Sequence, residues 1–281
     1  MKAKNLTILS GLVCLIALFI SCTKANLDDD FPPGDVPPVA GGYTAADQVA
    51  AANLVTKMSF EGNLSDSISK TNATAYGTIF GKGIKGQGLS VGLNHYALFT
   101  PTAGIKSLQS MTISFWVNTP QNTTGIQAPI SFVHPTEFWG NLDMFFDGQT
   151  PSSSIFKMHL WGSGGTKEAW LASWSISNPW SSWQHITLSY NMETSTFSFY
   201  VNGSLVGTSV QTGFGSPNFA NLSNIVIGTV QFMTTPSLTS GATSQSWASY
   251  VLGSIDELRI YNKGLTAIEA SALAILERRG Q

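Results

Sequence analysis

The chain has 281 residues and a formal net charge of −2 at pH 7, and only 11 % of its residues are charged. Lysine and arginine cluster nowhere beyond Arg278-Arg279, which argues against nucleic acid or an acidic surface as a partner. Few charges combined with abundant Ser, Thr, Asn and Gly are typical of an exported β-protein with polar, uncharged outer faces.

The N-terminus has the pattern of an export signal. Lys2 and Lys4 precede an apolar run over residues 6–20, which is short for a membrane span but suits the core of a signal peptide. The run ends in Leu-Phe-Ile-Ser-Cys at Cys22, which resembles the lipobox of bacterial lipoproteins. The resemblance implies removal of residues 1–21 and acylation of the Cys22 thiol. The alternative is an ordinary secretory signal with an incidental cysteine.

Residues 22–52 are predicted to form an acidic, proline-rich tether. The other cysteine, Cys14, lies in the signal, so the mature protein would hold Cys22 alone and no disulfide. Prolines within residues 31–38 favour an extended chain. The acidic triplet at residues 28–30 resembles signals that send lipoproteins to the outer face of the outer membrane in some Gram-negative bacteria. We expect a lipid-anchored protein of the outer membrane that faces the exterior. A periplasmic orientation is the alternative.

One domain is predicted over residues 53–281, a length that suits a single β-sandwich. A short helix over residues 44–52 precedes it, either in the tether or packed on the domain. Asn202-Gly203 predicts a tight hairpin, and Thr266 with Glu269 predicts the capping box of a closing helix. Alternating apolar and polar side chains predict strands over residues 54–60, 110–117, 184–190, 196–201, 204–207, 224–228 and 254–260.

A series of short motifs occurs in one order along the chain. They are Phe60-Glu61-Gly62-Asn63, Gly83-Ile84-Lys85-Gly86-Gln87-Gly88-Leu89, Thr112-Ile113-Ser114-Phe115-Trp116-Val117, Trp183-Gln184-His185-Ile186, Tyr200-Val201-Asn202-Gly203, Ile225-Val226-Ile227-Gly228 and Gly253-Ser254-Ile255-Asp256-Glu257-Leu258-Arg259-Ile260-Tyr261-Asn262. Together they resemble a laminin G-like, concanavalin A-like lectin/glucanase domain of the pentraxin type. The resemblance implies an all-β jelly-roll sandwich of two antiparallel sheets with a short C-terminal helix. It also implies recognition of something outside the cell.

The acidic residues do not follow the pattern of the related glucanases. Those enzymes carry Glu-x-Asp-x-x-Glu on one strand, and retaining hydrolysis needs two carboxyls about 5 Å apart. No segment here has that spacing. Asp143 and Asp147 could share a strand face, but a third carboxylate is missing. The chain also lacks a Gly-x-Ser-x-Gly elbow and a His-x-x-x-His metal pair. We therefore expect no catalytic residues.

The resemblance implies a structural calcium between the first strand motif and the last strand. The matching positions are Glu61, Asn63 and Asp256, with backbone carbonyls from residues 83–88. Such oxygen donors suit calcium. Alternatively, Glu61 and Asp256 cap backbone groups or form salt bridges.

Tryptophans gather in the middle of the chain, which in related folds contributes to the concave face. Exposed indole rings stack on the apolar faces of sugars. We expect Trp139, Asp143, Trp161, Trp170 and Trp174 to line a ligand cleft, and Trp170 and Trp174 to share a face of one strand. Alternatively, several of these rings are buried in the core of the sandwich. Of Trp139, Trp161, Trp170, Trp174, Trp180 and Trp247, we expect two to be exposed.

Three functions follow from these features. The first is a lipid-anchored, non-catalytic glycan-binding protein that captures poly- or oligosaccharide beside an outer-membrane uptake system. The second is a glycoside hydrolase with an atypical active site. The third is an adhesion or structural protein with a protein partner, which would show a broad apolar patch. Separately, Asp66-Ser67-Ile68 resembles a bacterial O-glycosylation sequon, which implies a modified Ser67.

Overall fold

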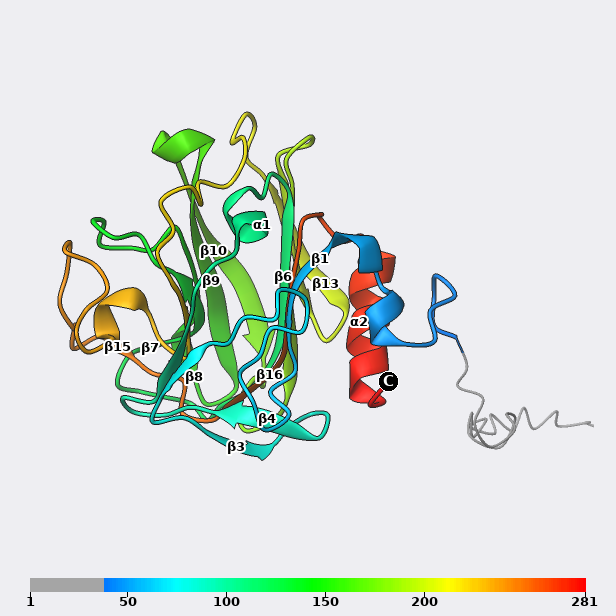
Figure 1. The fold of residues 1–281 in the computed structure, drawn as a ribbon, viewed down its shortest axis with the longest axis horizontal. Helices are drawn as coiled ribbons and strands as arrows, with labels where there is room; N and C mark the ends of the chain where they lie inside the picture. The colour runs from blue at the N-terminus through cyan, green and yellow to red at the C-terminus, as the bar shows by residue number, and fades with distance from the viewer. Residues whose placement is uncertain (1–37) are drawn as a thin grey trace, which may run out of the picture. The chain divides into compact units, whose positions relative to one another are not determined.

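Two sheets of eight strands each pack face to face in the computed structural model, which describes residues 38–281. Residues 38–281 form one compact unit (Figure 1). The predicted signal peptide, Cys22 and the acidic triplet lie outside the described residues. The expected all-β sandwich with a short C-terminal helix is confirmed. Within the described residues, no helix is long and apolar enough to cross a membrane.

The first sheet carries most of the motifs noted in the sequence. Its order is β13-β12-β11-β6-β16-β4-β3, and β1 pairs with β16. The strands are β1 (Leu54–Met58), β3 (Ile79–Lys82), β4 (Gln87–Ser90), β6 (Met111–Asn118), β11 (Gln184–Asn191), β12 (Thr196–Val201), β13 (Ser204–Val210) and β16 (Ser254–Tyr261). The predicted hairpin at Asn202-Gly203 joins β12 to β13, and both residues have positive φ, 52° and 78°.

The second sheet holds the middle of the chain. Its order is β10-β9-β8-β7-β14-β5-β2, and β15 pairs parallel with β7. The strands are β2 (Thr74–Tyr76), β5 (Tyr96–Phe99), β7 (Ile126–Phe132), β8 (Leu142–Thr150), β9 (Ser153–Gly162), β10 (Lys167–Ser177), β14 (Ile225–Ile227) and β15 (Ala248–Ser249). Alternation along β8 sends Leu142, Met144 and Phe146 into the core between the sheets.

Helix α2 (Ala267–Arg278) covers the outer face of the first sheet, on the right in Figure 1. The predicted capping box is present: Thr266 Oγ1 accepts the Glu269 N–H at 3.3 Å, and Glu269 Oε2 accepts the Thr266 N–H at 2.8 Å. The other helical segments are α1 (Ala103–Lys106) and the 3₁₀ turns η1 (Ala46–Gln48), η2 (Ala51–Asn53), η3 (Ser163–Gly165) and η4 (Gln231–Met233).

Residues 44–52 form two 3₁₀ turns that pack on the domain. Ala46 and Val49 are buried against Leu273 and Leu276 of α2. The compact unit therefore begins at Pro38, ahead of residue 53, where the domain was predicted to start.

Candidate ligand-binding groove

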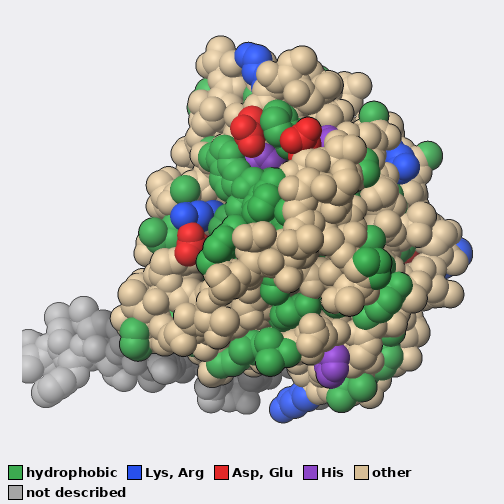
Figure 2. Space-filling view, turned by 90° about the vertical axis from the view of Figure 1, so that its left-hand side faces the viewer, with side chains coloured by type: hydrophobic (Ala, Val, Ile, Leu, Met, Phe, Trp, Pro, Cys, Tyr) green, Lys and Arg blue, Asp and Glu red, His purple; other side chains and the backbone are tan. Residues whose placement is uncertain are grey.

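On the outer face of the second sheet, side chains from neighbouring strands stand next to one another at paired positions. Cross-strand pairs place Asp143 of β8 beside His159 of β9, and His159 beside Trp170 of β10. Two residues further along β8, Phe145 lies opposite Lys157 of β9. Because side chains alternate along a strand, this set points away from the core that the preceding and following residues fill. Figure 2 views this side of the molecule, where hydrophobic side chains gather in a continuous patch with acidic side chains at its upper end.

Aromatic rings form a hollow of about 350 Å³ on this face. Trp139 stacks on Phe145, with ring centroids 5.4 Å apart. The same ring meets Trp170 edge-on at 5.2 Å and Trp247 at 5.8 Å. Trp170 is 43 % exposed and Trp247 is 42 % exposed, so two flat apolar faces flank the hollow. The expectation of two exposed tryptophans among the six is confirmed.

A carboxylate fixes the orientation of the exposed Trp170 ring. Glu168 Oε1 accepts the indole N–H of Trp170 at 3.0 Å and lies 2.9 Å from His159 Nε2. His159 is fully buried, and its Nδ1 lies 3.5 Å from Asp143 Oδ2. Asp143 in turn accepts hydrogen bonds from Ser131 Oγ and from the Gly140 N–H. Glu168 Oε2 has no hydrogen-bond partner within residues 38–281 and can accept one from a ligand.

The hollow continues past Trp247 into a second one of about 250 Å³. Both are lined by Ile126, Asp147 and Trp247, and the second adds polar side chains that include Thr123 and Gln149. Asp147 pairs with Lys157 at 2.6 Å on the rim of the first hollow. We call the two connected hollows the Trp groove. One end is aromatic and the other is rich in amides and hydroxyls.

The prediction that Trp174 shares a face with Trp170 is wrong. A β-bulge between Leu171 and Trp174 shifts the register of β10 against β9, so the alternation slips by one residue. Trp174 therefore points into the core, where its ring stacks on Phe199 at 4.8 Å. Its burial leaves no ring face for a ligand.

Of the other predicted residues of the cleft, Trp139 and Trp170 line the Trp groove. Trp161 and Asp143 do not line it. The Trp161 ring meets that of His159 edge-on at 5.8 Å. Asp143 is fully buried beneath His159, so it can support the site without touching a ligand.

Sequence reasoning missed Glu168, His159 and Trp247 as parts of this site. Glu168 and His159 would have followed from pairing β9 with β10, had those strands been predicted. Trp247 comes from the segment between β14 and β15, which has no periodic pattern. Its contribution could not be read locally.

The predicted calcium residues meet at a different place, around the turn between β3 and β4. Glu61 Oε2 accepts the Gln87 N–H at 3.0 Å, and Asp256 Oδ2 accepts the Ile84 N–H at 2.9 Å. A Cβ added at Gly83 would lie 2.3 Å from Asp256 Oδ2, so this turn needs glycine to approach the carboxylate. Asn63 instead closes a local turn by accepting the Ser65 N–H at 2.9 Å.

Burial raises the pKa of Asp256 to about 7, and the neighbouring Glu257 charge adds to this, while backbone N–H groups oppose it. No cation pairs with Asp256 among residues 38–281. In the same part of the chain, no cluster of three or more His, Cys, Asp or Glu side chains could hold a metal ion. The oxygen donors Glu61 and Asp256 fit a calcium ion only if backbone carbonyls or waters complete the shell.

Comparisons with known proteins place the chain in a family. The model of the concanavalin A-like lectin/glucanases superfamily, laminin G type, matches residues 92–271. No curated protein matches. The fold is similar to the binding domain of Paraclostridial Mosquitocidal Protein 1, with 16 % identity, a TM-score of 0.60 and coverage of 79 % of this chain and 52 % of that one. This chain thus spans about half the length of that structure.

Two further solved structures share the fold. Domain 4 of AbnA, a GH43 extracellular arabinanase from Geobacillus stearothermophilus, was solved in complex with arabinotriose. It is 20 % identical with a TM-score of 0.56, over 79 % of this chain and 98 % of that one. The binding domain of botulinum neurotoxin serotype G is 19 % identical with a TM-score of 0.56, over 80 % and 51 %. The matched motifs, the two-sheet sandwich and these neighbours agree, and the chain belongs to the concanavalin A-like lectin/glucanases superfamily.

Proposed function

We propose that this protein binds poly- or oligosaccharide in the Trp groove without cleaving it. The observation that carries the proposal is the exposed Trp170 ring, held by its N–H on Glu168 while Glu168 Oε2 stays free. A sugar ring offers an apolar C–H face for the indole and hydroxyl groups for the carboxylate. Because Trp170 is fixed before binding, little side-chain entropy is lost on association.

Binding without hydrolysis is favoured by how the acids near the groove are used. Asp143 is buried and accepts from Ser131 and Gly140, and Asp147 is paired with Lys157. Neither is free to act as the second carboxylate that a retaining or inverting glycosidase needs. A domain of the same fold, domain 4 of AbnA, was solved with arabinotriose, which supports an oligosaccharide as the ligand class.

The length of the Trp groove favours a chain of several sugars over a single one. The aromatic hollow and the polar hollow meet at Trp247, so one sugar can stack on Trp170 while the next units lie over Thr123 and Gln149. Each hollow alone has a volume near or below the lower end of the range of about 300–1,000 Å³ that small-ligand sites have.

A glycan array tests this function. The protein carries Cys22→Ser to keep it free of lipid, and Trp170→Ala is compared with Leu205→Ala, which removes an exposed side chain of β13 on the other sheet. We expect selective binding to one polysaccharide class, lost with Trp170→Ala and kept with Leu205→Ala. Silence across plant, host and microbial glycans would favour a protein-binding surface domain instead.

We further propose that Cys22 is lipidated and holds the domain at the outer membrane, beside a glycan-uptake system. Support comes from the sequence alone, in the lipobox-like segment that ends at Cys22 and in the acidic residues 28–30. Metabolic labelling with a palmitate analogue tests the anchor, because label that persists in a Cys22→Ser variant would exclude acylation there.

A structural calcium ion at Glu61 and Asp256 is also proposed. It would offset the cost of burying the Asp256 carboxylate, which has no cationic partner within the described part of the chain. Its role would be stability, since β3 and β4 belong to the first sheet, whereas β8, β9 and β10, which carry the groove, belong to the second.

A further inference from the structure

A second aromatic hollow lies toward the other edge of the second sheet. Tyr76 of the edge strand β2 lies directly opposite Tyr96 of β5. Their rings stack with centroids 4.8 Å apart and an angle of 8° between the ring planes. Tyr96 is 3 % exposed, whereas Tyr76 is 40 % exposed. The buried ring thus supports one face of a ring that reaches the surface.

The support is fixed by the segment that follows η4. Tyr96 Oη accepts the Thr235 N–H at 3.1 Å and donates to the Thr235 carbonyl at 3.4 Å. Gly77 follows Tyr76 with a φ of 70°, and a Cβ there would lie 2.3 Å from the His95 ring. Tyr96 is thus fixed before any ligand arrives, and its ring holds one face of Tyr76, which lowers the entropy lost on binding.

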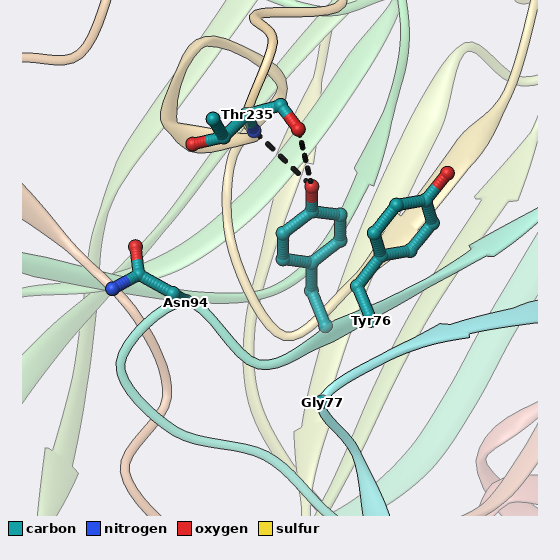
Figure 3. A pocket seen from close by; sticks show the side chains of 5 residues that line it. Tyr76, Gly77, Asn94 and Thr235 are labelled. Atoms are coloured by element: carbon teal, nitrogen blue, oxygen red, sulfur yellow. Dashed lines mark hydrogen bonds between the residues drawn. The ribbon is translucent and has the colours of Figure 1, made fainter.

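The hollow has a volume of about 430 Å³ and is lined by Tyr76, Gly77, Asn94, Tyr96 and Thr235. Figure 3 shows Tyr76 and Asn94 on opposite flanks, with Thr235 above them. No charged side chain lines it. A ligand that fits this lining is therefore uncharged, with an apolar face for the tyrosine.

Unused hydrogen-bonding groups border the hollow. The Asn94 side-chain amide lies 3.0 Å from the hydroxyl of Tyr250, which also donates to the Met233 carbonyl at 2.5 Å. Within residues 38–281, the second polar atom of the Asn94 amide has no hydrogen-bond partner, and neither have Thr235 Oγ1 and Tyr76 Oη. An amide group and two hydroxyls beside an aromatic ring match the alternating hydroxyls and C–H face of a sugar.

We propose that this tyrosine hollow is a second binding site, for one neutral sugar residue. It shares no lining residue with the Trp groove, so the two sites are physically separate. The proposal goes beyond the proposed function, because either site can bind sugar without the other. Two sites on one face would let a polysaccharide bind at two points, which raises its apparent affinity by avidity.

Saturation-transfer NMR on a protein with a disabled Trp groove tests this site. The background is Trp170→Ala with Trp247→Ala, and the probes are the methyl glycosides of glucose, galactose, mannose, xylose, arabinose and N-acetylglucosamine. We expect saturation transfer to at least one probe, and Tyr76→Ala in that background should weaken its binding about tenfold, the size expected for a lost aromatic contact. Ile79→Ala, an exposed residue of β3, is the matched control and should change nothing.

Asn94→Asp provides a second test that does not depend on the aromatic ring. Aspartate keeps the size of the side chain, leaves Tyr250 bonded to the Met233 carbonyl and replaces the amide nitrogen by a charged oxygen, so we expect weaker binding in a folded protein. The proposal is overturned if no probe receives saturation in the background protein, or if Tyr76→Ala and Asn94→Asp both leave binding unchanged. Transfer that depends on Tyr76 while the wild type gives no groove-dependent array signal would support this site and reject the proposed function of the groove.

Discussion

Two tryptophans of one strand show how a single residue position separates surface from core. Trp170 is exposed beside the Trp groove, and Trp174 lies between the sheets on Phe199. Four residues apart on a regular strand they would share a face, but the bulge after Leu171 inserts one residue. The bulge therefore leaves one of the two rings available on the surface and buries the other in the core.

Stability measurements on the two alanine variants should separate these roles. Trp174→Ala leaves a cavity in the core and should lower the free energy of unfolding by about 3–5 kcal/mol. Trp170→Ala removes an exposed ring and should change it by no more than about 0.5 kcal/mol. Urea unfolding followed by fluorescence gives both values. Equal losses in the two variants would mean that the strand is not bulged as described.

Asp256 carries a testable consequence of burial. Its pKa is raised to about 7, above that of an unfolded aspartate, so its ionisation costs stability as pH rises from about 4 through about 7. Calcium needs the ionised form. Added calcium should therefore raise the melting temperature more at pH 8 than at pH 5.5, and Asp256→Asn should remove this difference. A calcium effect that is equal at both pH values, or is kept by Asp256→Asn, would speak against the site.

At the scale of elements, a buried ionic cluster joins α2 to the first sheet. Arg259 of β16 donates to Glu277 of α2 at 2.6 Å, to Glu257 at 2.9 Å and to Asp47 of η1 at 2.7 Å. Trp116 of β6 also donates to Glu277, at 2.7 Å. One guanidinium thus connects the closing strand, the closing helix and the N-terminal turn.

Replacement of Arg259 tests how far this cluster holds α2 in place. Arg259→Met keeps the side-chain length but leaves Glu257 and Glu277 buried without their cation. Breaking a buried pair in this way typically costs about 3–5 kcal/mol. Thermal unfolding should show that loss, whereas Lys263→Met, which removes the exposed partner of the half-buried pair with Glu269, should cost at most about 1 kcal/mol. A loss below about 1 kcal/mol for Arg259→Met would show that packing alone docks the helix.

The sequence predicted the first sheet far better than the second. On β11 and β12 the alternation was clear enough for bounds within one residue of those observed. Strands β7, β8, β9 and β10 were not predicted, although the groove stands on them. On their outer face, apolar side chains such as Phe145 pack against the segment around Phe232. Apolar residues therefore occur on both faces of these strands, and the sequence shows no alternation there.

The candidate site was predicted in part for the same reason. Composition indicated which aromatic residues were available, and Trp139 and Trp170 do line the groove. Trp247 reaches the groove only through the tertiary fold, and Trp174 was misplaced because a bulge leaves no sequence signal of its own. Glu168 lies next but one to Trp170 and was not considered, because its partner His159 stands on an unpredicted strand.

At the scale of the whole molecule, the two outer faces of the sandwich differ in what covers them. One is covered by α2 and by residues 39–53, which include the first described residues of the chain. The other carries the Trp groove and, toward its opposite edge, the tyrosine hollow. The proposed ligand sites therefore lie on the outer face that α2 does not cover.

Calorimetric titration with an oligosaccharide ladder tests the central claim most directly. Units one to six of the sugar class found on the array are titrated into the wild type, Trp170→Ala and Trp247→Ala. Binding in the Trp groove predicts affinity that rises with length beyond two units, a loss of about tenfold with Trp170→Ala, and a flattened length dependence with Trp247→Ala. Affinity that is the same for all lengths and for all three proteins would contradict a glycan site in this groove.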